Sequence, residues 1–248
     1  MGAMIYRAAP AVALISLVAV GLAGDEVSPG ELVRRAEQQL IAGNPQQALE
    51  LAGRAIAAEP ANPRWHNYRG GLRFRLGMIR PSIDDFDRAI ELAPHTAPHH
   101  WQRGISYYYA GEFEKGAKQF ELHQTVNRND VENAVWHFLC VAKWKGLEEA
   151  KARLIPIQGD PRVPMMQVHA LFAGHATPAD VLAAAREGDP AAAELAQRLF
   201  YAHLYLGLYY EAHGQTERSA EHIRIAVERY PAQHYMGDVA RVHQTLRK

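Results

Sequence analysis

The feature that most constrains this chain is a set of glycine and phenylalanine residues that recurs after 34 positions. A glycine inside a helix costs about 0.8–1.0 kcal/mol relative to alanine, so its recurrence indicates a packing requirement. We expect the first glycine to let two helices approach and the second to end the first helix. Ser82 and Gly116 are then the small residues opposite in the second helix, and the phenylalanines four positions later are the large ones. The recurring pairs are Gly70 and Gly104, Gly77 and Gly111, and Phe86 and Phe120.

This spacing is that of the tetratricopeptide repeat (TPR), a helix-turn-helix unit, and residues 63–96 and 97–130 resemble two such repeats. Extending the frame predicts a further repeat at 29–62, another at 200–233 and a degenerate pair at 131–155. The sequence therefore predicts an all-α fold, a TPR-type α-solenoid of antiparallel helix pairs. Each pair is expected to bury its apolar face against its neighbours.

Two segments lie outside this frame. Residues 156–199 break the period with several prolines and are expected to form an irregular helical segment, either a functional insertion or a worn repeat. Residues 234–248 have Met236, Val239, Val242 and Leu246 at helical spacing. We expect them to form a C-terminal capping helix that covers the end of the last repeat.

The first 23 residues resemble a secretory signal peptide, with Arg7 followed by an apolar run and small residues before Gly24. The apolar run from 8 to 20 is shorter than the roughly 20 residues of a membrane-spanning helix. We expect cleavage near Ala23 and a periplasmic or otherwise extracytoplasmic protein. An uncleaved anchor is the alternative, and membrane contact is expected only in that case.

The charge balance bears on the class of partner. The chain has 27 basic and 27 acidic residues, and no basic stripe, which argues against a nucleic-acid partner. Cys140, the only cysteine, lies in an apolar helical run, where a buried structural role is favoured over a nucleophilic one. No intrachain disulfide can form.

The sequence contains no hydrolase elbow, phosphate-binding loop, zinc-protease motif or Cys-x-x-Cys pair, so we predict neither catalytic residues nor a cofactor. His95, His99 and His100 lie together in the connector between the second and third repeats. No Cys, Asp or Glu accompanies them there to complete a metal site, and none is predicted. A metal-responsive or enzyme-associated subunit that uses these histidines is an alternative.

The first helix of each TPR lines the concave face of the solenoid, and aromatic and arginine side chains often dominate binding energy at such faces. The chaperone-type carboxylate clamp is absent, because the corresponding positions include Val33, Glu37 and Pro98. Tyr108 and Tyr109 have an alternative role in packing between repeats. The predicted partner-binding residues are Arg64, Asn67, Phe74, Arg75, Trp101, Ile105, Tyr108 and Tyr109.

The runs from Gln102 to Gly111 and from Leu204 to Tyr210 resemble the repeats of NlpI-type adaptor proteins of the bacterial cell envelope. The order of parts is similar, including the tryptophans at 136 and 144 in the irregular pair. The resemblance implies an outer-membrane lipoprotein that docks envelope proteases and cell-wall hydrolases. This chain lacks the cysteine that would be lipidated.

These observations favour an exported, non-catalytic TPR adaptor or scaffold in the bacterial envelope, with a protein or peptide partner. Besides the histidine-based alternative, the chain could be a homo-oligomeric structural TPR protein whose own tail or insertion fills the groove.

Overall fold

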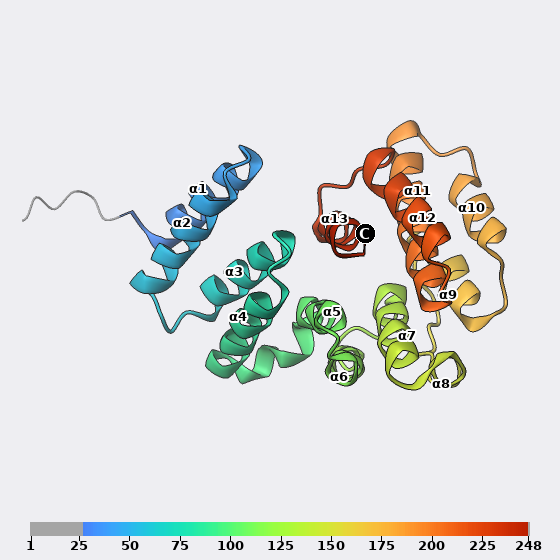
Figure 1. The fold of residues 1–248 in the computed structure, drawn as a ribbon, viewed down its shortest axis with the longest axis horizontal. Helices are drawn as coiled ribbons and strands as arrows, with labels where there is room; N and C mark the ends of the chain where they lie inside the picture. The colour runs from blue at the N-terminus through green and yellow to red at the C-terminus, as the bar shows by residue number, and fades with distance from the viewer. Residues whose placement is uncertain (1–26, 248) are drawn as a thin grey trace, which may run out of the picture.

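The computed structural model describes residues 27–247, which form thirteen α-helices and one 3-10 helix and contain no strand. Figure 1 shows successive helices packed in antiparallel pairs that curve around the last helix, α13. The predicted all-α TPR-type solenoid is confirmed. The predicted signal peptide at 1–23 lies outside the described residues.

The first half of the described chain forms four helix pairs. Their bounds are α1 (Pro29–Ile41) with α2 (Pro45–Ala58), α3 (Pro63–Arg75) with α4 (Ile79–Leu92), α5 (Trp101–Ala110) with α6 (Phe113–His123), and α7 (Val131–Lys145) with α8 (Leu147–Ala152). The 3-10 helix η1 (Pro94–His99) lies in the histidine-bearing connector, and the first helix of the third repeat begins at Trp101. Pro98 lacks a backbone N–H and cannot continue an α-helical hydrogen-bond ladder.

The recurring glycines and phenylalanines pack against each other within each repeat. A Cβ atom placed on Gly70 would lie 2.9 Å from the Phe86 ring, and one on Gly104 would lie 2.7 Å from the Phe120 ring. Both distances are shorter than van der Waals contact, so only glycine permits this approach of the paired helices. Gly77 has a φ of +72°, which suits its place in the turn between α3 and α4.

Between the fourth helix pair and the last repeat, the chain departs from the repeat frame. The second half of the chain contains α9 (Met165–Ala173), α10 (Pro178–Arg186), α11 (Ala192–Ala212) and α12 (Thr216–Glu228). The expected boundary between residues 199 and 200 falls inside α11, because the stretch from 192 to 199 contains neither glycine nor proline to end a helix. The long α11 joins the irregular segment to the last repeat as one element.

Helix α13 (Tyr235–Leu246) forms where the sequence predicts a helix, but it is more than an end cap. It packs on α12 and also contacts α3, which is far away in the sequence. In Figure 1 it is seen nearly end-on, in dark red, between α3, α5 and α12. The C-terminal helix therefore turns back into the concave face of the solenoid, which corrects its expected place.

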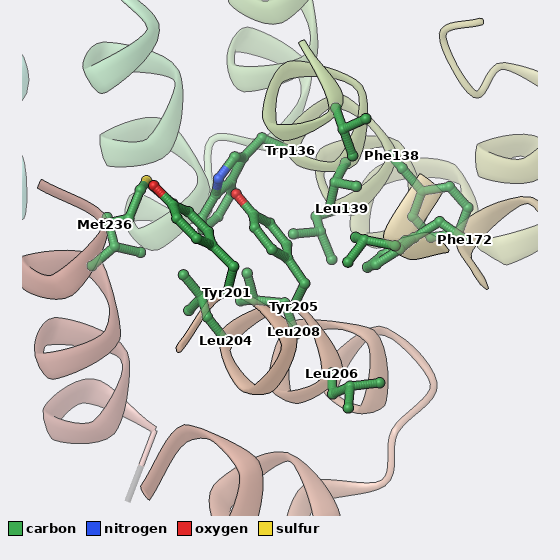
Figure 2. Close-up of a cluster of buried hydrophobic side chains, with 14 of the residues drawn as sticks. Trp136, Phe138, Leu139, Phe172, Tyr201, Leu204, Tyr205, Leu206, Leu208 and Met236 are labelled. Atoms are coloured by element: carbon green, nitrogen blue, oxygen red, sulfur yellow. The ribbon is translucent and has the colours of Figure 1, made fainter. Parts of the chain in front are cut away.

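The largest hydrophobic core lies in the second half of the chain. Figure 2 shows Trp136 and Leu139 of α7 facing Tyr205 of α11, with Phe172 of α9 and Met236 of α13 at the sides. Cys140 is fully buried in this core, and burial raises the pKa of its thiol. No helix within residues 27–247 combines the length and apolarity needed to cross a membrane.

Two adjacent glycines of α3 test the packing argument. We expect Gly70→Ala to lower the free energy of unfolding by about 1–3 kcal/mol, because its Cβ would overlap the Phe86 ring. Gly71→Ala is the matched control: it has open space around it, and we expect it to raise stability by up to about 1 kcal/mol through helix propensity. Urea unfolding measures both. Equal effects of the two substitutions would contradict the account.

Candidate functional site

The concave face of α3 and α5, which we call the groove, holds α13 through aromatic stacking. The Tyr235 ring stacks on Phe74 with a centroid distance of 5.3 Å and meets the edge of Trp101 at 5.0 Å. Such aromatic pairs contribute about 0.5–1.5 kcal/mol in addition to the free energy gained by burying their apolar area. Tyr235 thus anchors the start of α13 between the second and third repeats.

An ion pair supports this anchor. Arg75 Nε lies 2.9 Å from Asp238 of α13, and its Nη1 donates to Glu37 of α1 at 3.0 Å. Burial opposes the charge of Arg75, but the two carboxylates outweigh it and raise the pKa of the guanidinium. One side chain therefore connects the first repeat, the second repeat and the C-terminal helix.

Polar contacts continue to the other end of α13. Tyr109 Oη lies 3.0 Å from His243 Nδ1, and the Tyr108 hydroxyl donates to Glu211 of α11 at 2.6 Å. Arg247 donates to the same carboxylate at 2.9 Å. Burial lowers the pKa of His243 to about 4, so this imidazole is neutral at physiological pH.

The predicted groove residues divide into two groups. Phe74, Ile105 and Tyr108 are fully buried, and Tyr109 and Arg75 are covered or paired by α13. Tyr108 and Tyr109 also pack on Trp136, which is the alternative role expected for them. The remaining three, Arg64, Asn67 and Trp101, line a cleft of about 270 Å³ at the rim of the groove. Partner contact by any of the eight residues stays a prediction.

Comparison with known proteins agrees with this geometry. The chain is similar in structure to a tetratricopeptide repeat protein from Parabacteroides merdae, with a TM-score of 0.55 and 18% identity, over 90% of this chain and 86% of that one. The chain has a TPR fold. It is also similar to MamA from Desulfovibrio magneticus RS-1, with a TM-score of 0.50 and 14% identity, over 81% of this chain and 93% of that one.

Comparison of the sequence identifies relatives over a smaller part of the chain than comparison of the structure does. No protein-family model matches this TPR chain. The curated SGT1 homolog of Bos taurus is 24% identical over 123 residues, which are 50% of this chain and 36% of that protein. The chain thus spans about a third of the length of this curated relative.

The histidine connector of this TPR protein is a joint between repeats. His95 and His99 are exposed, whereas His100 is buried, with Nε2 at 3.2 Å from Thr96 Oγ1. Burial lowers the pKa of His100 to about 4. The part of the chain that the structure describes contains no group of three or more His, Cys, Asp or Glu side chains placed to hold a metal ion.

A larger cleft, of about 940 Å³, lies beside the C-terminal half of α13. It is lined by Ile223 and Arg224 of α12, Lys143 of α7, and Leu246 and Arg247 of α13. A molecule bound in this cleft would contact both the solenoid and α13.

One cluster near the groove has no counterpart in the sequence analysis. Arg162, in the irregular segment, donates to Asp130 at 2.7 Å and also bonds to Glu132 and Asp160. Tyr205 of α11 donates to Glu132 at 2.7 Å. Asp160 is two residues from Arg162, but Asp130 and Glu132 are 32 and 30 residues away from it, and Tyr205 is 73 residues from Glu132. No local spacing marks these long-range contacts, and only the acidic start of α7 gives a signal.

The buried state of His243 predicts a dependence of stability on pH. An unfolded histidine takes up a proton near pH 6.5, whereas folding holds the pKa of His243 at about 4. The neutral form therefore stabilises the fold above about pH 6.5, and this contribution is lost as the pH falls toward 4.

Lowering the pH from 7 to 5 should reduce the free energy of unfolding of the wild-type protein. We expect the reduction in His243→Gln to be smaller by about 1–2 kcal/mol, because the variant lacks the buried imidazole. Urea unfolding at the two pH values measures the difference, and His95→Gln, at an exposed position, is the control. Parallel losses in the wild-type protein and His243→Gln would show that α13 does not bury this imidazole.

Proposed function

We propose that this TPR chain is a non-catalytic adaptor or scaffold that binds a protein or peptide partner at the rim of its groove. The single observation that carries the proposal is the docking of α13. A surface that holds one helix through Phe74, Trp101 and Arg75 has the aromatic and cationic chemistry of a protein-binding face.

The rim offers the accessible part of that surface. Arg64 is exposed, forms no salt bridge among the described residues and lies over the Trp65 ring at 5.5 Å from its centroid. Asn67 and Trp101 line the same cleft and are half-buried. Because α13 occupies the centre of the groove, a partner contacts the rim residues first. An unpaired cation next to an amide and an indole suits a peptide that presents a carboxylate beside an apolar side chain.

We propose further that the adaptor acts in the bacterial cell envelope. The signal-peptide pattern of residues 1–23 and the resemblance to NlpI-type adaptors support this location. An envelope protease or cell-wall hydrolase is then the proposed class of partner.

Binding to a partner isolated from envelope extracts tests the proposal. We expect Arg64→Glu to weaken that binding by about tenfold or more, because it places a repulsive charge at the rim. Arg88→Glu is the control, since Arg88 is also exposed but lies on α4, the second helix of the same repeat, where it pairs with Glu91. Isothermal calorimetry measures both affinities.

Equal affinities of Arg64→Glu and Arg88→Glu would contradict binding at the rim. A partner found in cytosolic extracts and not in envelope extracts would contradict the proposed location.

A further inference from the structure

A polar cavity of about 190 Å³ lies between the groove and the start of α7. Trp101 and Ile105 of α5, Phe120 of α6, Trp136 of α7 and Met236 of α13 form its apolar walls. It lies beside Asn127, which is exposed, and Asp130, which is partly exposed, so the cavity has a route to solvent. Two predicted groove residues, Trp101 and Ile105, therefore border a space that α13 leaves unfilled.

Two buried polar atoms that belong to cavity residues lack a hydrogen-bond partner. Asn133 Nδ2 donates to the Phe120 carbonyl at 3.2 Å and to Gln124 at 3.1 Å, which leaves Asn133 Oδ1 free. Trp136 Nε1 is also unpaired, although only 1% of that residue is exposed. Leaving a buried acceptor without a partner is unfavourable, so a guest that donates a hydrogen bond to Asn133 Oδ1 would be stabilised. The Trp136 indole N–H is itself a donor, so it reports on a guest in the cavity and does not attract a cation.

The cavity is also negatively charged. Asp130 and Glu132 are the charged side chains that line it. Arg162 lies behind them and is shared with a third carboxylate, that of Asp160. Three carboxylates thus share one guanidinium, and a cationic guest would offset the remaining negative charge. Burial raises the pKa of Glu132, and the nearby Asp130 acts in the same direction, whereas Arg162 opposes the rise.

We infer that this cavity binds the side chain of a lysine residue in the partner. This inference rests on the proposed function for the source of the lysine, but the preference of the cavity for an alkylammonium group is a property of this chain alone. The alkyl stem would lie along Ile105 and Phe120, and the ammonium group would face Asn133 Oδ1 and the acidic side chains.

Lysine is favoured over arginine because of the acceptors that remain. Asp130 and Glu132 already bind the Arg162 guanidinium, so they do not offer a second guanidinium a free pair of oxygens. Asn133 Oδ1 is a single acceptor, which suits one of the three N–H donors of an ammonium group.

Titration of the protein with n-butylammonium chloride tests the inference without any partner. We expect saturable binding that shifts the NMR signal of the Trp136 indole N–H, whereas butyramide, a neutral molecule of similar size, binds about tenfold more weakly or not at all. Asp130→Asn should weaken butylammonium binding by about tenfold, because it removes a charge but keeps the oxygen that caps α7. Glu148→Gln, at a highly exposed site on α8, should leave it unchanged.

Equal binding of butyramide and butylammonium, or no movement of the Trp136 signal, would overturn the inference and leave a cavity that holds only water. An unchanged affinity in Asp130→Asn would overturn it as well. Failure of the rim test with Arg64→Glu would instead contradict the proposed function and leave a cavity that binds ammonium groups.

Discussion

The packing of α13 against the concave face is the interaction on which the rest of the structure depends. A TPR solenoid is usually held by contacts between neighbouring repeats, so its two halves are connected only through the repeats between them. Here Tyr235 and Asp238 connect α13 to α3, while Arg247 connects it to α11. The C-terminal helix thus joins repeats that are distant in the sequence.

This packing changes the character of the groove. Phe74 and Tyr109, which would be exposed in an open solenoid, are buried against α13. The surface left for a partner is narrower and more polar than a groove without α13 would be. It consists of the cationic rim at Arg64 and the acidic cavity at Asp130. A partner with a carboxylate and a lysine at suitable spacing would match both, which gives specificity through charge complementarity.

The local structure could be predicted from the sequence, but the place of α13 could not. The close approach of two helices at Gly70 depends on residues within one repeat and follows from the 34-residue period. The apolar residues Met236, Val239 and Val242 predict a helix with a buried side, yet that side could equally cover the last repeat. The contact between Tyr109 and His243 joins residues 134 positions apart, and no repeating pattern in the sequence predicts it. The same limit applies to the cavity, which depends on side chains from four helices.

Amide hydrogen exchange of the full chain tests most directly whether α13 lies in the groove. The account predicts that the amides of 235–246 are protected as strongly as those of α3 and α11, and that Tyr235→Ala reduces the protection of both α13 and α3. Rapid exchange throughout 235–246, with α3 and α5 fully protected, would contradict it, because the groove would then be stable without its C-terminal helix.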